Sequence, residues 1–288
     1  MKLEYAHSKE ITFGALRGHA LQSKKLSDKT QPLIAIHGWL DNLSSFMPLM
    51  QEQPNWPWLS VDLIGHGYSQ WRSESSYYYF ADYLCDFVSL IEEHYPQGVH
   101  LIGHSLGGAI ASLLAGILPD LVKSVVLIDA LGPLTSDVDA VAEQLRLSLY
   151  QHRNPKAQRY YKSLEIMALA RQKKHHIKKT SCDLLVKHGF EHQKEGYIWS
   201  FDPKLFYLSP MQMTQEQVLS ILKIAKAPML FIKAIEGYPM QSTILDERMA
   251  ILPHLEYRTL HGGHHVHMDY PLEVALLIKS FYHQHNIF

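Results

Sequence analysis

The sequence predicts an α/β fold built on a doubly wound, mostly parallel eight-stranded sheet that carries one inserted helical segment. Two observations indicate this fold. Short apolar runs that end in polar or glycine residues alternate with stretches of helical periodicity through most of the chain. A long interval without such runs, residues 131–226, then separates the last two runs from the others. A chain of 288 residues is long enough to bury one core of this kind together with an insertion.

The first strands are expected near the N-terminus, where residues from Ile11 to Arg17 partly alternate between apolar and polar and indicate an antiparallel hairpin. The runs that follow are short and apolar, which is typical of parallel strands buried on both faces. They are Leu33–His37, Trp58–Asp62, Val99–Gly103 and Val125–Asp129, and the pattern resumes after the interval with Pro228–Ala234 and Tyr257–His261.

Helical spacing of apolar residues predicts a helix after most of these runs. The first is expected to open at Ser75 and Ser76, and it carries apolar residues at Phe80, Leu84, Phe87 and Ile91. The others are Leu106–Leu118, which ends before Pro119, Thr243–Leu252, and a last helix from Pro271 onward. Strands and helices therefore alternate, which predicts helices on both faces of the sheet.

The long interval must have structure of its own, because loops of that length are uncommon in compact domains. It contains the helix-like stretches Ala140–Tyr150 and Lys156–Ala170 and no run of strand type. We therefore expect residues 1–130 and 227–288 to form the core and residues 131–226 to form a helical cap. The basic run Arg171–Lys179 lies in this segment. Such a run can bind an anion or a membrane surface, but one short run on a neutral protein is more typical of a solvated helix face.

Composition excludes several classes of partner. The net charge of -1 provides no field that would attract nucleic acid or anionic lipid, so neither is expected as a partner. The start of the chain, Met1 to His7, lacks the pattern of a targeting peptide, and no apolar run reaches membrane-spanning length. We expect a soluble, cytoplasmic protein. Cys85 and Cys182 are far apart without metal-type spacing, which indicates two reduced, largely buried thiols.

One motif carries chemistry directly. The run Val99–Gly103 leads into Gly103-His104-Ser105-Leu106-Gly107 and then into a helix of small residues. Gly-x-Ser-x-Gly between a strand and a helix is the context of a nucleophile elbow, in which a strained turn projects the serine hydroxyl. The helix N-terminus behind it favours developing negative charge. A glycine-rich turn with an incidental serine is the alternative. We interpret Ser105 as the nucleophile.

With this motif the chain resembles the α/β-hydrolase superfamily over nearly its whole length, and more loosely the serine-hydrolase-like proteins within it. The resemblance rests on stretches that occur in the family's order and spacing. They are His37-Gly38-Trp39, Asp62-Leu63-Ile64-Gly65-His66-Gly67-Tyr68-Ser69, Gly103 to Gly108, and Gly263-His264 followed by Pro271.

The resemblance implies a catalytic histidine in the loop before the final helix, where it directly follows a glycine. His264 fits that position, and His265 and His267 are second choices. So many imidazoles could instead form a zinc site and a metal-dependent hydrolase, but such sites usually recruit further ligands from rigid elements. The serine motif already accounts for the chemistry, so we expect neither a metal nor a cofactor.

An oxyanion formed during acyl transfer needs preorganised donors. The backbone N–H of Leu106, directly after the nucleophile, is one candidate. The resemblance implies Trp39 as the second donor, and its ring is expected either to form a wall of the acyl pocket or simply to pack. His37 and Asp62 are expected to brace the loops around the site.

The acid that orients the histidine has two candidates. In this superfamily it commonly follows the strand after the cap, but Glu236 and Gly237 occupy that region without an aspartate. In some members it ends the preceding strand, where Asp129 closes an apolar run. We favour Asp129, because an aspartate at the end of a buried strand needs a partner.

The sequence thus predicts a serine hydrolase that acts by acyl transfer on a small or medium carboxylic ester, with the acyl substrate and water as its partners. Cleavage of a thioester, a lactone or a C–C bond stays open, as does ligand binding without catalysis on the same fold. The cap contributes apolar residues that could line a pocket, although cap packing is the commoner role: Leu205, Phe206, Tyr207, Leu208, Met211 and Met213.

Overall fold

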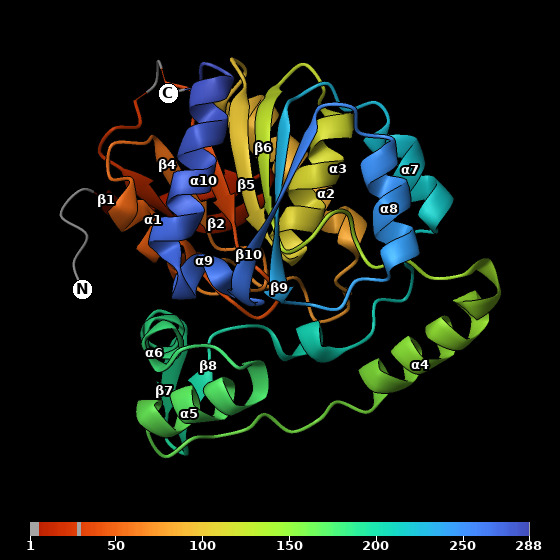
Figure 1. Cartoon of the computed structure of the whole chain (residues 1–288). Coiled ribbons are helices and arrows are strands. Elements are labelled where there is room, and N and C mark those ends of the chain that lie inside the picture. Colours follow the sequence, from red (N-terminus) through yellow and green to blue (C-terminus); the bar gives the residue numbers. More distant parts are fainter. Residues whose placement is uncertain (1–5, 28–29, 288) are drawn as a thin grey trace.

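The computed structural model describes residues 6–27 and 30–287, so the first five residues of the N-terminal stretch considered above lie outside it. Its centre is one eight-stranded sheet with the order β1-β2-β4-β3-β5-β6-β9-β10 (Figure 1). Strands β1 and β2 form the expected antiparallel hairpin, and the neighbouring strands β4, β3, β5, β6, β9 and β10 run parallel to one another. The bounds are Ala6–Phe13 (β1), Leu16–Ser23 (β2), Leu33–Ile36 (β3), Trp58–Val61 (β4), Val99–His104 (β5), Val122–Ile128 (β6), Met229–Glu236 (β9) and Leu255–Gly263 (β10).

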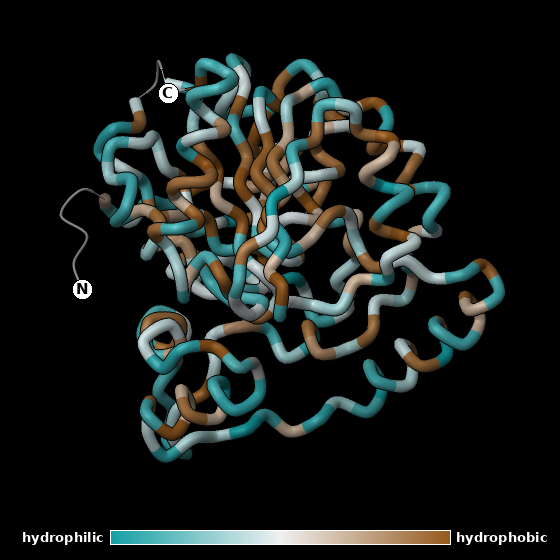
Figure 2. Tube along the Cα trace, in the orientation of Figure 1, coloured by the Kyte–Doolittle hydropathy of each residue, from teal (hydrophilic) through white to brown (hydrophobic). Residues whose placement is uncertain are grey.

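Helices cover both faces of this sheet (Figure 1). One face carries α1 (Met47–Glu52), α9 (Val266–Asp269) and α10 (Pro271–Gln284), and the other carries α2 (Phe80–His94), α3 (Leu106–Ile117), α7 (Gln215–Leu222) and α8 (Ser242–Ala250). Strand β3 shows how the alternation of side chains feeds both cores. Ile34 and Ile36 belong to the core under α2 and α3, whereas Leu33 and Ala35 belong to the core under α1 and α10. The hydrophobic trace in Figure 2 accordingly concentrates in the central strands. The predicted fold class is confirmed.

Element boundaries differ from the predicted ones at a few ends. Helix α2 begins at Phe80 rather than at Ser75, because Tyr79 is still extended and its N–H donates to the Asp82 carboxylate at 3.1 Å. Such a bond caps the first turn and fixes where the helix starts. Within the described residues, none of the helices combines the length and the apolar character needed to cross a membrane.

The inserted segment, residues 131–226, connects β6 to β9 (Figure 1). Most of it lies along one edge of the sheet, but α7 near its end packs on a face of the sheet through Val218 and Leu222. Its helices include α4 (Val141–Arg153), α5 (Leu164–His175) and α6 (Lys179–Lys187). Helix α5 begins later than the predicted Lys156, because Ser163 caps it by accepting the N–H of Ile166. The segment also contains an antiparallel hairpin of β7 (Phe190–Gln193) and β8 (Gly196–Trp199), so the expectation that it lacks strands was wrong.

Two further expectations are corrected in part. Arg171, in the basic run, is buried and forms an ion pair with Asp41, whereas Lys173 and Lys174 on the same helix are exposed as a solvated face would be. Cys182 is buried as expected, but Cys85 is exposed on α2. A residue type and its neighbours predict average burial, and the fold decides it for each side chain.

Candidate active site

Ser105 lies in the tight turn between β5 and α3, with φ 53° and ψ -116°. Few non-glycine residues adopt a positive φ, and backbone strain of this kind is common where a side chain must be presented for chemistry. The turn depends on its glycines. A Cβ on Gly103 would overlap the backbone of Gly107, and a Cβ on Gly107 would overlap the carbonyl oxygen of Ile36.

His264 follows β10 directly, and Asp129 follows β6 with its own φ at 51°. Because these parallel strands flank β9, their carboxyl ends lie at the same edge of the sheet. There His264 Nδ1 lies 2.6 Å from Asp129 Oδ2, and the imidazole donates to the carboxylate when its proton is on Nδ1. The structure brings Ser105, His264 and Asp129 to the wall of one pocket.

Asp129 is buried and receives several hydrogen bonds besides that from His264. The backbone N–H of Tyr238 donates to Oδ2 at 2.7 Å, and the Ala234 N–H donates to Oδ1 at 3.1 Å. The Lys233 ammonium donates to Oδ1 at 2.6 Å. Burial raises the pKa of Asp129, but these donors outweigh it and hold the pKa below its usual value, so the carboxylate is ionised at neutral pH.

The contact with Lys233 was not anticipated. Its signal in the sequence is a lysine inside the otherwise apolar run Pro228–Ala234. A partly buried strand lysine needs an acceptor, and besides Asp129 this ammonium donates to the carbonyl oxygens of Ala234 and Tyr238. Lys233 thereby ties the end of β9 to the end of β6.

Glu236, the other candidate acid, lies elsewhere. Its side chain is 58% exposed, it accepts the backbone N–H of Gly262, and it lies 3.5 Å from His261 Nδ1. It contacts the end of β10, and it is absent from the described residues that line the pocket. The geometry therefore places Asp129, and not Glu236, in a position to orient His264.

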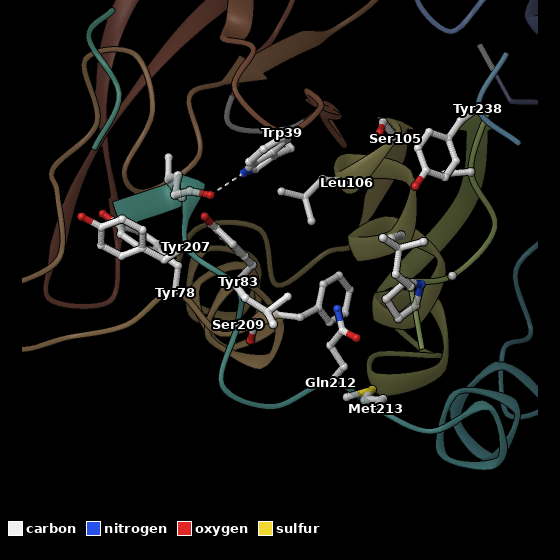
Figure 3. Close-up of a pocket in the computed structure, with 18 of the residues that line it drawn as sticks. Trp39, Tyr78, Tyr83, Ser105, Leu106, Tyr207, Ser209, Gln212, Met213 and Tyr238 are labelled. Atoms are coloured by element: carbon white, nitrogen blue, oxygen red, sulfur yellow. Dashed lines mark hydrogen bonds between the residues drawn. The ribbon is translucent and has the colours of Figure 1, made fainter. Parts of the chain in front are cut away.

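The two candidate oxyanion donors, Leu106 and Trp39, both line the pocket beside Ser105. Leu106 is the first residue of α3, and Trp39 follows Gly38 in the loop after β3. The Trp39 indole N–H donates to the carbonyl oxygen of Leu205 at 3.0 Å, which the dashed line in Figure 3 marks. Its ring therefore forms a wall of the pocket and ties the loop to the inserted segment.

His37 and Asp62 hold the surrounding loops. His37 Nδ1 bonds the carbonyl oxygen of Gly38, and its Nε2 accepts the N–H of Leu63, which fixes a neutral tautomer. Burial lowers the pKa of His37, in agreement with that state. Asp62 accepts the N–H groups of Leu43 and Tyr68.

His265 and His267 are buried behind His264 and do not line the pocket among the described residues. One possible metal-ligand atom each of His265, His104 and Asp41, a ring nitrogen or a carboxylate oxygen, lies within 4.8 Å of the other two, a spacing at which a metal ion could be held. However, the Asp41 carboxylate already forms an ion pair with the Arg171 guanidinium, whose charge opposes a cation at the same carboxylate. These four residues, Asp41, His104, Arg171 and His265, are called the Asp41 cluster below.

The pocket has a volume of about 590 Å³ and is mostly aromatic and apolar. All six apolar residues that the sequence suggested for the inserted segment line it, so their role extends beyond cap packing. Among its described lining residues there is no lysine or arginine. Figure 3 draws part of this wall, including Trp39, Tyr78, Tyr83, Ser105, Leu106, Tyr207, Ser209, Gln212, Met213 and Tyr238.

Comparison with known proteins adds an independent line of evidence. A family model described as alpha/beta hydrolase fold matches residues 31–176. A serine hydrolase-like protein of Danio rerio is 26% identical over 94% of this chain and 86% of its own length. A probable serine hydrolase of Drosophila melanogaster is 29% identical over 88% of this chain and 82% of its own length. The crystal structure of a hypothetical protein from Pseudomonas aeruginosa PAO1 superimposes with a TM-score of 0.88 at 29% identity, covering 96% of this chain and 99% of that one.

Proposed function

This chain belongs to the alpha/beta hydrolase fold family, and from that premise we propose that it is a serine hydrolase acting by acyl transfer on a carboxylic ester. One observation carries the proposal. The His264–Asp129 pair, joined at 2.6 Å, lies with Ser105 on the wall of a single apolar pocket. The serine hydrolase names of the relatives agree with the reaction type.

In the proposed mechanism, neutral His264 takes the proton of the Ser105 hydroxyl while the Ser105 oxygen attacks the ester carbonyl carbon. The carbonyl oxygen becomes an oxyanion, to which the backbone N–H groups of Leu106 and Trp39 donate hydrogen bonds. Asp129 keeps the second ring proton of His264 on Nδ1 and stabilises the imidazolium. His264 then protonates the leaving alcohol. In the second half of the reaction His264 takes a proton from water, the water oxygen attacks the carbonyl carbon of the acyl-enzyme, and His264 returns the proton to Ser105 as the acid leaves.

The pocket supports a neutral, apolar substrate. Among its described lining residues there is no lysine or arginine to pair with a negatively charged acyl group, and such a group would lose its hydration on entering the pocket. A volume of about 590 Å³ is within the range of small-molecule sites. We propose that the inserted segment acts as a cap over the pocket, since Phe206 and Met211 line it from that segment.

The test is hydrolysis of p-nitrophenyl esters of increasing acyl length by the full chain, with a thioester, a lactone and a C–C substrate in parallel. Turnover should be highest for a neutral ester and should disappear in Ser105→Ala. A negatively charged acyl group of equal size is the matched control and should be a poor substrate. Absence of turnover on every substrate would favour the alternative of a ligand-binding protein on this fold.

A further inference from the structure

The Asp41 cluster joins segments that each adjoin a residue of the proposed chemistry. Asp41 follows Trp39 by two positions, His104 directly precedes Ser105, and His265 directly follows His264. Only Arg171 comes from the inserted segment, on α5. The side chains are 1% exposed at Asp41, 6% at Arg171, 1% at His104 and 4% at His265. The cluster is therefore a built, buried junction and not a surface contact.

Arg171 holds the loop that follows Trp39 at two points. Its Nη2 donates to Asp41 Oδ1, and its Nη1 donates to the carbonyl oxygen of Leu40 at 3.0 Å. Leu40 has φ 60°, a conformation that a leucine rarely adopts and that its surroundings must enforce. The Leu40 N–H is held in turn by His66 Nε2 at 3.2 Å. The Arg171 guanidinium thus helps to hold this loop, and with it the backbone N–H of Trp39, in position.

The same carboxylate reaches the histidine loop. Asp41 Oδ2 lies 3.2 Å from His265 Nε2, and His104 Nε2 donates to the backbone carbonyl oxygen of His264 at 2.8 Å. His104 Nδ1 faces Asp41 Oδ2 at 3.6 Å. Movement of Asp41 would therefore change the positions of His265, which follows His264, and of His104, which bonds the His264 backbone.

Charge explains why Arg171 is needed. Burial raises the pKa of Asp41, but the hydrogen bond with His265 and the charge of the Arg171 guanidinium overcome that effect and hold the pKa well below the usual range. Burial lowers the pKa of His265 to about 4 and also lowers that of His104, so both rings are neutral at pH 7. Within the described residues, the guanidinium of Arg171 is the cation paired with this buried carboxylate. Without it an unpaired charge would remain between the two loops.

Arg171 is itself anchored in the inserted segment. Its guanidinium carbon lies 5.3 Å from the ring centre of Trp199 on β8. Nearby contacts fasten the same part of the segment to the core: Asn42 Nδ2 donates to the carbonyl oxygen of Leu185 at 2.9 Å, and Ser181 Oγ donates to Asp269 Oδ1 at 2.7 Å. Both contacts hold α6, and α5 packs on α6 in one buried cluster, so the docking of this part of the segment does not depend on Arg171 alone.

We propose that Arg171 is a positioning residue, which through Asp41 couples the docking of the inserted segment to the alignment of the Trp39 N–H and the His264 ring. The proposal rests on the proposed function. It assigns to the cap a part in turnover as well as in enclosing the substrate. Arg171 is absent from the described pocket lining, so its loss should change turnover more than substrate binding.

The test compares kcat and KM for the best ester substrate in Arg171→Met, Arg171→Lys and Lys174→Met. Lys174 is exposed on the same helix and provides the matched control. We expect kcat to fall about 10- to 100-fold in Arg171→Met, with KM nearly unchanged. Arg171→Lys should recover part of the loss, since it keeps the charge but not the fork that reaches both acceptors. Lys174→Met should equal the wild type.

A double variant, Arg171→Met with Asp41→Asn, tests whether the effect passes through Asp41. The fall in kcat in the double variant should be no greater than in Arg171→Met or Asp41→Asn alone, because no unpaired carboxylate remains. All rates are compared per folded protein, with thermal melts to measure the folded fraction. A kcat within about twofold of wild type in folded Arg171→Met, or a rise in KM alone, would overturn the proposal. Absence of turnover in the wild type would instead refute the proposed function.

Discussion

The assignment of Asp129 as the acid makes a prediction that follows from its hydrogen bonds. In Asp129→Asn, an amide NH₂ must replace one carboxylate oxygen. Oδ1 accepts from Lys233 and Ala234, and Oδ2 accepts from His264 and Tyr238. The Lys233 ammonium has the strongest demand for an acceptor, so the remaining oxygen should stay on its side. The NH₂ group would then face His264.

The expected magnitude follows from the tautomer. Facing an NH₂ donor, His264 Nδ1 must accept, so the ring proton moves to Nε2 and the ring can no longer take the proton of Ser105. Loss of the correct tautomer lowers kcat by about 10⁴-fold in serine hydrolases with a triad. At about 1.36 kcal/mol for each tenfold change, this is about 5.4 kcal/mol of transition-state stabilisation.

The assay is ester hydrolysis by Asp129→Asn with Glu236→Gln as its matched control. Glu236 carries the same charge, but its side chain is 58% exposed and accepts the N–H of Gly262 at the end of β10. We expect Glu236→Gln to keep kcat within about threefold of the wild type. Loss of turnover in Glu236→Gln, with Asp129→Asn still active, would refute the assignment of the acid.

Three further predictions concern the turn, the buried ion pair and the pocket. Gly107→Ala should lower the free energy of unfolding by about 3 kcal/mol or more in urea denaturation, because its Cβ overlaps the carbonyl oxygen of Ile36. Lys233→Met should cost about 2 kcal/mol at pH 7, below the usual cost of breaking a buried pair because other donors remain on Asp129. The lowered pKa of folded Asp129 gives stability that is present above the unfolded pKa and lost as the pH falls through the folded one. Losing Lys233 raises that folded pKa towards the unfolded value, so the loss of stability on acidification should be smaller and complete at a higher pH in melts recorded from pH 7 to pH 3. Phe206→Ala should raise KM about tenfold for long apolar esters with little change for acetate, as measured across the acyl series.

The central sheet could be predicted because its strands are buried on both faces and therefore appear as unbroken apolar runs, such as Leu33–Ile36. The hairpin of β7 and β8 could not. Strand β7 is the polar sequence Phe-Glu-His-Gln and is largely exposed, so neither hydrophobicity nor alternation marks it. Its pairing with β8 depends on contacts that no local pattern contains.

Much of the candidate site was within reach of the sequence, because Ser105 and His264 lie in local motifs and Asp129 ends an apolar strand. Arg171 was not. It lies among lysines and histidines that resemble a solvated helix face, and its partner Asp41 is 130 positions away. A side chain whose role depends on one distant counterion carries no periodic signal. Lys233 stands out as a lysine in an apolar run, but nothing local to it identifies Asp129, 104 positions away, as its partner.

The most direct test of the account is the reaction of the full chain with a fluorophosphonate probe, followed by intact mass and peptide mass spectrometry. We predict one covalent adduct on Ser105, no adduct in Ser105→Ala, and a rate of labelling that falls sharply in His264→Gln. The matched control, His261→Gln, alters an exposed histidine near the end of β10, three positions before His264, and should label at the wild-type rate. Absence of an adduct from the wild type, or ester turnover that persists in Ser105→Ala, would contradict the account.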